Sequence, residues 1–489
     1  MNTKIGFDNE KYIKMQSKFI GERVHKFGDK LYLELGGKLF DDYHASRVLP
    51  GFQPDSKMKM LTHLKDKLEI VIVISADDIV KNKVRGDYNI TYDVDTLRLI
   101  DAFESLNFKV GSVVITKYTN QPSADVFKKR LENKGVKVFL HYPIEGYPSN
   151  VEFIVSDNGF GKNDYIETER PIVVVTAPGP GSGKMATCLS QLYHENKRGI
   201  KAGYAKFETF PVWNLPLKHL VNLAYEAATV DLNDVNMIDP FHLEAYGETT
   251  INYNRDIEVF PVLNAIFEKI LGESPYKSPT DMGVNMAGNC IIDEKVVEDA
   301  CKNEIIRRYY QVLKDKTNGK MSDSTVYKME LIMKQAEVSL DMREVVAAAN
   351  EKGKETGSPA CAIQLSNGKV ITGKTSALLG ASSAALLNAL KEISGIEDSV
   401  HLISPEVIEP LQGLKVNHFG SKNPRLHLDE TLIALSICAA NDPLAKKALG
   451  ALNSLKCTEA HSTVLLSRVD ETVFKKLGVN LTCEPVYKK

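Results

Sequence analysis

The chain lacks the features that mark membrane proteins, secreted proteins and strongly basic nucleic-acid binders. No apolar run approaches the roughly 18 residues of a transmembrane helix. The first residues, MNTKIGFDNEKYIKMQSKF, have no apolar core of the signal-peptide kind. Sixty-one Lys and Arg residues face 63 Asp and Glu residues, which leaves a net charge of -2. Proteins that bind nucleic acid by bulk electrostatics are strongly basic, so we expect neither nucleic acid nor membrane as a partner.

Paired cysteines are also absent. The chain has seven cysteines and no CxxC motif, at Cys188, Cys290, Cys301, Cys361, Cys438, Cys457 and Cys483. An odd, dispersed set fits reduced thiols in a cytoplasm better than a disulfide framework or a zinc ribbon. The 489 residues are 43% hydrophobic and 25% charged, which is typical of folded globular domains. Composition therefore predicts a cytoplasmic protein of several domains.

Residues 1–230 alternate between strand and helix patterns. The predicted strands are Leu31–Leu35, Glu69–Ser75, Gly111–Thr116, Val136–His141, Pro171–Thr176 and Lys201–Lys206. The predicted helices between them are Val94–Leu106, Ala124–Asn133 and Lys184–Lys197. Near-continuous apolar strands such as IVIVIS suit a parallel sheet that is covered on both faces. We predict a Rossmann-like, doubly wound α/β domain over this region.

Two further regions follow. Strand patterns stop over residues 231–350, where Asp256–Leu271, Val296–Asp315 and Ser324–Asn350 are predicted helices. Residues 351–489 return to an α/β pattern: CAIQLSNGKVITG predicts a hairpin around Asn367-Gly368. A helix is expected at Ser376–Ile393 and a strand at VLLS (464–467). We therefore predict a mainly helical middle region and a smaller C-terminal α/β domain.

The segment PIVVVTAPGPGSGKMATCLSQLYHENKRG (171–199) has the pattern of a phosphate-binding loop. A buried strand leads into a glycine-rich turn, and a helix begins near Lys184. Glycines let backbone N–H groups approach an anion, and the helix N-terminus adds the positive end of its dipole. The predicted phosphate-binding residues are Gly179, Gly181, Ser182, Gly183, Lys184 and Thr187. A tight turn with a solvated lysine is the alternative.

This loop departs from the GxxxxGK[ST] pattern of nucleotide hydrolases. Pro178 replaces the first glycine, and Met185 replaces the Ser or Thr that contacts magnesium. The departures argue against nucleoside triphosphate hydrolysis. No Walker B strand follows, although Asp77-Asp78 ends an earlier strand and offers metal ligands. The metal requirement stays open, with Mg²⁺ accompanying a nucleotide as one possibility.

The polar segment after this domain supplies the candidate catalytic residues. His219, Asn222 and Glu226 share one face of a predicted helix that opens at Pro216. Asp231, Asp234, Asn236, Asp239, His242 and Glu244 then fall within 14 positions. Carboxylates and imidazoles at this density suit general acid–base chemistry. We predict His219, Glu226, Asp239, His242 and Glu244 as catalytic residues, with a solvated face as the alternative. Thr280, Asp281 and Asn285 are further candidates for the same cleft, with a helix-capping loop as the favoured alternative.

Two weaker patterns suggest other sites. Gly36-Gly37-Lys38 with His44, Ser46 and Arg47 suggests a second anion-contacting loop. The C-terminal hairpin and the small-residue helix after it resemble the cytidine-deaminase fold. Zinc deaminases carry a His/Cys-Ala-Glu motif and a PCxxC motif. This chain has Ala381-Ser382-Ser383 and no PCxxC, so zinc deamination is not expected. Lys422–Arg425 and the Cys457, Glu459 and His461 cluster mark the alternative site there.

Four segments together resemble one protein family. They are LELGGKLFDDYHASRVLPGF (33–52), APGPGSGKMATCLSQLYHE (177–195), NMIDPFHLEAYG (236–247) and LKCTEAHSTVLLSRVD (455–470). Over nearly the whole chain the sequence is similar to the bacterial proteins of domain-of-unknown-function family 1846. The resemblance implies a cytoplasmic bacterial protein with a Rossmann-like N-terminal region and a deaminase-like C-terminal region. It implies no reaction, substrate or catalytic residue.

The sequence thus favours an enzyme that binds a nucleotide or another phosphorylated small molecule at the glycine-rich loop. Phosphoryl transfer or another group transfer is the expected reaction class. A non-catalytic, oligomeric protein that binds a phosphorylated metabolite is one alternative. A transferase that uses the zinc-free C-terminal domain is another. A homo-oligomer is expected in each case.

Overall fold

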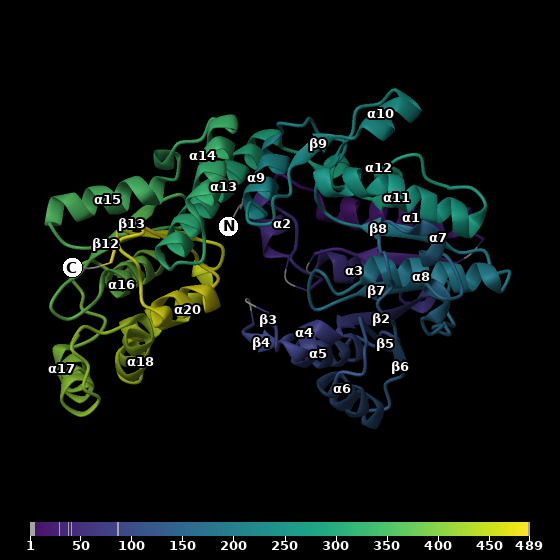
Figure 1. The fold of residues 1–489 in the computed structure, drawn as a ribbon. Helices are drawn as coiled ribbons and strands as arrows, with labels where there is room; N and C mark the ends of the chain where they lie inside the picture. The colour runs from purple at the N-terminus through teal and green to yellow at the C-terminus, as the bar shows by residue number, and fades with distance from the viewer. Residues whose placement is uncertain (1–4, 29, 38, 41, 86–87, 488–489) are drawn as a thin grey trace. The chain divides into compact units, whose positions relative to one another are not determined.

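The computed structural model describes residues 5–28, 30–37, 39–40, 42–85 and 88–487. The chain divides into two compact units. The first, here called the N-terminal unit, contains Ile5–Tyr225 and Asp234–Glu298. The second, the C-terminal unit, contains Glu226–Asn233 and Asp299–Lys489. Each unit has its own sheet, coloured purple to teal in the first and green to yellow in the second (Figure 1). The expected division into three domains at 230 and 350 stays a prediction.

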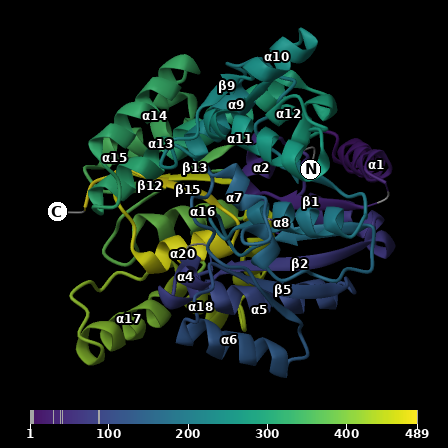
Figure 2. The same ribbon diagram turned by 45° about the vertical axis from the view of Figure 1, so that its right-hand side comes forward.

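A seven-stranded parallel sheet forms the centre of the N-terminal unit. Its strands, in spatial order, are β11 (Gly283–Val284), β8 (Gly203–Phe207), β1 (Leu31–Leu35), β7 (Ile172–Thr176), β2 (Leu68–Ser75), β5 (Val110–Thr116) and β6 (Val138–Leu140). Every residue of β1, β2 and β7 is buried, as expected for strands covered on both faces. The prediction of an α/β fold with a parallel sheet is confirmed. Figure 2 shows β1, β2 and β5 in this sheet.

The strand order reverses between β1 and β7. The chain runs from β1 past β7 to β2 and outward to β6, then returns to β7 and passes β1 to reach β8. Right-handed connections in opposite directions place their helices on opposite faces. The segments that leave the carboxyl ends of β1 and β7 therefore diverge, and open α/β sheets bind ligands at such a point. The glycine-rich loop follows β7 directly.

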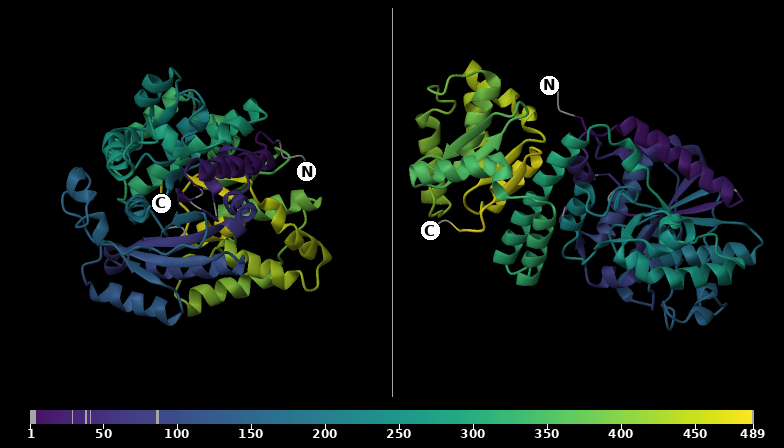
Figure 3. Two further views of the ribbon diagram at one scale, coloured as in Figure 1. Left: turned by 90° about the vertical axis from the view of Figure 1, so that its right-hand side faces the viewer. Right: turned by 90° about the horizontal axis from the view of Figure 1, so that it is seen from above.

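Helices flank the sheet of the N-terminal unit (Figure 3). They are α1 (Asn9–Lys26), α2 (Tyr43–Val48), α3 (Ser56–His63), α4 (Ala76–Val80), α5 (Tyr92–Ser105), α6 (Pro122–Asn133), α7 (Val151–Ile154), α8 (Lys184–Lys197), α10 (Pro240–Tyr246), α11 (Asn254–Leu271) and α12 (Pro279–Met282). Helix α8 packs on β1, β7 and β8, while α5 packs on β2 and β5. The helices α9 (Leu220–Ala228) and α13 (Glu294–Thr317) contain residues of both units.

The expectation that strands stop after residue 230 is wrong at three places. β9 (Asn236–Ile238) and β10 (Ile251–Tyr253) form an antiparallel pair. β11 extends the main sheet beside β8. A small pair, β3 (Val84–Arg85) with β4 (Ile90–Thr91), also lies in this unit. Strands of two or three residues are too short for an alternating pattern, which explains why sequence analysis missed them.

The C-terminal unit has a four-stranded mixed sheet in the order β13-β12-β14-β15. Its strands are β12 (Ala360–Gln364), β13 (Val370–Lys374), β14 (Glu459–Ser462) and β15 (Asn480–Cys483). β12 is antiparallel to β13 and β14, and β14 is parallel to β15. The predicted hairpin around Asn367-Gly368 is therefore confirmed. The strand expected at VLLS (464–467) is wrong, because the strand there is β14, five residues earlier in the polar sequence EAHS.

Helices cover this second sheet and enclose an apolar core. They are α15 (Glu344–Thr356), α16 (Ala381–Ser394), α17 (Pro405–Gly413), α18 (Leu428–Cys438), α19 (Pro443–Gly450) and α20 (Arg468–Lys476), and α14 (Asp323–Gln335) belongs to the same unit. The long helix expected at Ser324–Asn350 is interrupted between α14 and α15. α16 packs on β12 and β13 through buried side chains such as Leu386 and Leu390. Among the described residues, no helix is both long and apolar enough to cross a bilayer.

Candidate functional site

The glycine-rich loop lies where the sheet order reverses, between β7 and α8. Backbone conformation explains one of its glycines, and close packing explains another. Gly183 has a φ of +92°, a left-handed conformation that side chains with a Cβ disfavour. Gly179 packs so closely on Tyr92 that a Cβ there would lie 2.2 Å from the tyrosine hydroxyl oxygen. Gly181 also has a positive φ, of +76°, but nothing lies within 4 Å of its would-be Cβ. The loop is therefore packed at its start and open in its middle.

Hydrogen bonds hold the loop on the sheet. The Thr116 hydroxyl, at the end of β5, donates to the Ser182 carbonyl over 2.6 Å. The Ser182 hydroxyl donates to the Gly179 carbonyl over 2.7 Å, and its side chain is buried. The Ser182 hydroxyl therefore stabilises the conformation of the loop. Its predicted role as a phosphate ligand stays a prediction.

The start of α8 carries two polar groups with no hydrogen bond in the described part of the chain. Lys184 is the first residue of the helix, and its side chain is only 15% exposed. Its ammonium group makes no hydrogen bond to any described residue, and the nearest carboxylate oxygen, on Glu34, is 3.9 Å away. One turn later the fully buried Thr187 hydroxyl also has no partner among the described residues. Buried polar groups are almost always hydrogen-bonded, so Thr187 is an exception among the described residues, whereas the Lys184 ammonium group is partly exposed and within ion-pair distance of Glu34.

The backbone adds donors at the same place. The first N–H groups of any α-helix have no partner within the helix. No described side chain caps α8, whereas Asp8 caps α1 and Asp42 caps α2. The helix dipole also favours negative charge here. The predicted loop thus presents its donors in the arrangement that an anion requires.

A cluster of charged side chains follows β1 and β8 at the same edge. Glu34, near the end of β1, accepts a hydrogen bond of 2.7 Å from the buried Tyr204 hydroxyl. Lys206, on β8, forms ion pairs with Asp256 at 2.6 Å and with Glu208 at 3.1 Å. We call Glu34, Lys184, Lys206, Glu208 and Asp256 the edge cluster.

Burial and charge act in opposite directions on this cluster. Burial disfavours the charged form of Lys206, but Asp256 and Glu208 outweigh it and raise the pKa of the lysine. Lys206 therefore stays protonated. Burial raises the pKa of Glu208, and Asp256 adds to the rise while Lys206 opposes it. A carboxyl group with a raised pKa binds a proton more readily than an ordinary carboxylate, which suits it to proton exchange.

A small cavity of about 40 Å³ adjoins the edge cluster. It is lined by Lys206, Glu208, Phe210, Pro211, Trp213, Ile251, Asn252, Asp256, Pro279, Thr280, Gly283, Val284 and Asn285. Several of its polar groups already have protein partners: the Trp213 indole N–H donates to the Asn285 carbonyl over 2.7 Å. Thr280 and Asn285, which are candidates for a common cleft in the sequence, both line it. This volume holds a few waters rather than a ligand.

The residues predicted from the polar segment around α10 are brought together, but each has a structural partner. Asp239 is fully buried and caps α10, accepting from the Phe241 and His242 N–H groups. Its second oxygen accepts from the Thr280 hydroxyl over 2.6 Å. The His242 ring nitrogen Nδ1 lies 2.9 Å from the Ser278 hydroxyl. Because Thr280 also lines the small cavity, Asp239 lies directly behind its wall.

The remaining predicted catalytic residues lie elsewhere. His219 Nε2 is 2.6 Å from a Glu294 carboxylate oxygen. Asn222, on the same face of the predicted helix, is buried and bonds both the N–H and the carbonyl of Val212. The alternative of a solvated face is therefore wrong for Asn222. Glu226 belongs to the C-terminal unit. The catalytic role of all five predicted residues stays a prediction.

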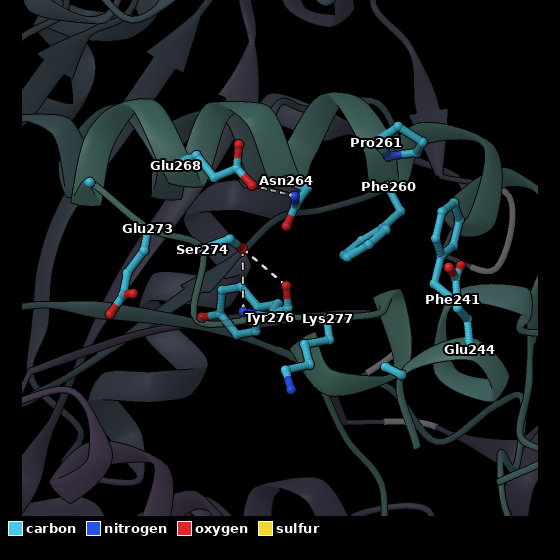
Figure 4. A pocket seen from close by; sticks show the side chains of 12 residues that line it. Phe241, Glu244, Phe260, Pro261, Asn264, Glu268, Glu273, Ser274, Tyr276 and Lys277 are labelled. Carbon is cyan, nitrogen blue, oxygen red and sulfur yellow. Dashed lines mark hydrogen bonds between the residues drawn. The ribbon is translucent and has the colours of Figure 1, made fainter. Parts of the chain in front are cut away.

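Glu244 lines a larger and more open pocket of about 770 Å³, shown in Figure 4. Its wall consists of Phe241, Glu244, Ala245, Phe260, Pro261, Asn264, Glu268, Gly272, Glu273, Ser274, Tyr276 and Lys277. The rings of Phe241 and Phe260 lie 4.9 Å apart on one side. On α11, the Asn264 amide donates to Glu268 over 2.8 Å. No residue of the glycine-rich loop lines this pocket.

A buried ion pair lies within the segment that follows β1, where the second anion loop was predicted. The Lys57 ammonium is buried and lies 2.9 Å from an Asp42 carboxylate oxygen. Burial disfavours the Asp42 carboxylate, but Lys57 outweighs it and lowers the pKa of the carboxyl group. His44 packs edge-on against Phe210, with ring centres 5.3 Å apart. Ser46 donates to the Tyr43 carbonyl of its own helix. Lys38 lies outside the described residues.

At the alternative site of the C-terminal unit, no hydrogen bond joins Cys457 to His461. His461 is fully buried on β14, and its Nδ1 lies 2.9 Å from the Thr482 hydroxyl. Its Nε2 lies 3.3 Å from a Glu484 oxygen, whereas Cys457 is exposed. Burial lowers the pKa of His461, although Glu484 opposes this. At the other predicted segment, the Arg425 guanidinium donates to the Ser376 carbonyl.

Asp77 and Asp78, after β2, are paired with Lys117 at 3.7 Å and Lys83 at 3.2 Å. Among the described residues, no group of three or more His, Cys, Asp or Glu side chains is arranged to hold a metal ion.

Sequence analysis missed most of the edge cluster. Glu34, Lys206 and Asp256 come from segments that are far apart in the chain, and a parallel sheet brings its strand ends to one edge. Glu34 and Lys206 do share one signal, because each is a charged residue at the end of an otherwise apolar strand. A charge buried at a strand end requires a partner, and that requirement was readable in the sequence.

Comparison with known proteins identifies the family of the chain. The family model described as domain of unknown function DUF1846, N-terminal, matches residues 5–337, and its C-terminal counterpart matches residues 341–489. The chain is 58% identical over 484 residues to a UPF0371 protein of Streptococcus pyogenes serotype M3, which covers 99% of this chain and 98% of the relative. A UPF0371 protein of Streptococcus uberis is 58% identical over 485 residues with the same coverage. The chain belongs to the DUF1846 family, which confirms the resemblance.

Proposed function

We propose that this protein binds a phosphorylated small molecule, with the phosphate at the N-terminus of α8. The observation that carries the proposal is the Lys184 ammonium group, which is 15% exposed and makes no hydrogen bond to the described chain. A phosphate there would accept from Lys184 and from the first N–H groups of the helix. The position of the loop at the reversal of strand order supports the same ligand site.

A group-transfer enzyme is the second candidate function, and Glu208 supports it. Its pKa is raised and it faces the cavity beside Lys206, so it could take or give a proton during transfer. The predicted catalytic roles of Asp239, His242 and Glu244 belong to this candidate, as do those of His219 and Glu226. Mg²⁺ would accompany the ligand if it is a nucleotide. Rossmann-like and deaminase-like relationships of the two units, a homo-oligomer and a cytoplasmic location remain part of the proposal.

Calorimetric titration with inorganic phosphate and with glycerol phosphate tests the binding proposal. The native protein should bind at least one of them, and Lys184→Ala should weaken binding by about tenfold or more, since one charge-assisted hydrogen bond contributes that much. Lys197→Ala is the matched control, because Lys197 ends the same helix and its side chain is 55% exposed. It should bind like the native protein.

Two results would overturn the proposal. One is the absence of binding of either phosphate compound to the native protein. The other is undiminished binding to a folded Lys184→Ala variant, which would assign the ligand to another site. His242→Ala tests the second candidate function once a reaction is found: a normal rate with this variant would remove His242 from the catalytic residues.

A further inference from the structure

Glu34 is placed to decide which phosphate compounds the loop accepts. Its carboxylate is only 8% exposed, and one oxygen lies 3.9 Å from the Lys184 ammonium group. The other oxygen accepts a hydrogen bond of 2.7 Å from the Tyr204 hydroxyl, which fixes the position of the Glu34 side chain. A phosphate bound to Lys184 would therefore have a fixed carboxylate beside it. Sites that bind polyphosphates usually surround the anion with donors and cations instead.

The other lysines around the loop do not offset this carboxylate. Lys206 is paired with Asp256 and Glu208. Lys57 is paired with Asp42. Lys83 and Lys117, after β2 and β5, are paired with Asp78 and Asp77. Among the described residues named here, five lysines including Lys184 face six carboxylates, so this part of the sheet edge offers little positive charge for a second phosphate group.

The charges and hydrogen-bonding groups divide the site into two halves. The glycine-rich loop, the start of α8 and Lys184 supply donors for one phosphate. Glu34 and Glu208 supply acceptors, and they adjoin each other through Gly36, where a Cβ would lie 2.6 Å from Glu208 Cγ. A ligand that satisfies both halves carries an anion at one end and hydroxyl or amino donors next to it. A chain of phosphates carries only acceptors and would leave the carboxylates unpaired.

We propose that the site selects a phosphate monoester whose organic part bears hydroxyl or amino groups, and that Glu34 rejects pyrophosphate and longer polyphosphates. This inference rests on the proposed binding of phosphate at α8. It narrows that proposal to one class of ligand and assigns the selectivity to one residue.

The test compares four probes by calorimetry: inorganic phosphate, methyl phosphate, glycerol phosphate and pyrophosphate. Methyl phosphate lacks the hydroxyl donors of glycerol phosphate, and pyrophosphate adds a second phosphate group. The native protein should bind glycerol phosphate about tenfold more tightly than pyrophosphate, a difference that one unfavourable charge contact can produce. It should also prefer glycerol phosphate to methyl phosphate.

The Glu34→Gln variant tests whether the charge of Glu34 causes this selectivity. This variant keeps the shape of the side chain and the Tyr204 hydrogen bond but removes the charge. It should raise the affinity for pyrophosphate about tenfold and reduce the preference for glycerol phosphate. Glu132→Gln, on the exposed surface of α6, makes the same change in net charge and should leave all four affinities unchanged. The preference of the native protein tests the inference even if Glu34→Gln does not fold.

The outcomes separate the inference from the proposed function. If the native protein binds phosphates but prefers pyrophosphate, or if Glu34→Gln keeps the native selectivity, the inference is wrong and the binding proposal stands. If no probe binds the native protein, both are wrong. If Lys184→Ala weakens all probes while Glu34→Gln changes only their order of affinity, both are supported.

Discussion

Three glycines of the loop between β7 and α8 differ in what an alanine would meet, although the sequence shows them as equivalent. Gly181 has a left-handed conformation in open space, and Gly179 has an ordinary conformation against Tyr92. Gly183 combines a φ of +92° with a would-be Cβ 3.2 Å from Thr116. Substitutions at these glycines therefore separate the cost of a left-handed backbone from the cost of close packing.

Alanine substitutions should rank these glycines by stability. Gly181→Ala should cost about 1 kcal/mol, the strain of a left-handed L-residue. Gly179→Ala should cost about 2–3 kcal/mol, since the buried Tyr92 ring must shift. Gly183→Ala carries both costs and should be at least as destabilised as Gly181→Ala. Urea denaturation measures all three. A Gly179→Ala variant as stable as the native protein would contradict the close packing on Tyr92.

Asp239 shows how a residue with catalytic chemistry can have a structural role. It was predicted from its density of polar neighbours, yet both oxygens are occupied by α10 and Thr280. Asp239→Ala should lower the free energy of unfolding by about 2–3 kcal/mol, because it removes a helix cap and leaves buried donors unpaired. Glu244→Ala, exposed on the same helix, should change stability by less than about 0.5 kcal/mol. Equal stabilities of the two variants in urea would contradict the capping role.

At the scale of elements, two helices of the C-terminal unit are joined at their N-termini by a titratable pair. His427 immediately precedes α18, and its Nδ1 lies 3.2 Å from the Asp470 carboxylate of α20. Asp470 also accepts from the Leu428 N–H over 2.7 Å and from the Ser467 hydroxyl. The hydrogen bond to Asp470 raises the pKa of His427, and burial opposes the rise.

This pair makes stability depend on pH. Because the pKa of His427 is higher in the folded chain than its ordinary value of about 6.5, the protonated form stabilises the fold. The contribution is complete below that ordinary value and is lost as pH rises through the folded pKa. We expect a loss below about 1 kcal/mol between pH 6 and 8, since the pair is partly exposed. His427→Asn should reduce this change in urea denaturation, while exposed His401→Asn should not. An unchanged pH dependence in His427→Asn would assign it to other groups.

The elements that could be predicted from sequence are those with long patterns. The apolar runs of β2 and β7 and the amphipathic α8 were predicted to within a residue or two. β14 was missed because EAHS contains charged and polar residues, and VLLS beside it has the stronger strand propensity. The buried His461 imidazole in that strand is compensated by the Thr482 hydroxyl, 2.9 Å from its Nδ1, and by the Glu484 carboxylate, 3.3 Å from its Nε2. Such compensation is tertiary and cannot be read from local sequence.

At the scale of the whole molecule, the candidate site combines a local motif with distant partners. Gly179 to Lys184 could be predicted because the loop is one continuous segment with its own conformation. Glu34, Lys206 and Asp256 could not, since the sheet order that brings them to one edge depends on how β1, β7 and β8 pair. The local part of the site predicts an anion, and the distant part carries our proposal about which anion fits.

The division into two units makes a prediction about ligand-dependent unfolding. Trp213 is the only tryptophan and lies in the N-terminal unit, so its fluorescence reports that unit alone. A phosphate ester at 100 times its dissociation constant should stabilise this unit by about 2.7 kcal/mol. In urea, the Trp213 transition should therefore move to higher concentration, while a far-UV circular dichroism transition of the C-terminal unit should stay in place. At the same ligand concentration Lys184→Ala should be stabilised by about 1.4 kcal/mol or less, since a tenfold or larger loss of affinity leaves the ligand at no more than ten times its dissociation constant. A single transition, coincident for both probes and shifted as a whole by the ligand, would mean that the two units unfold as one cooperative body.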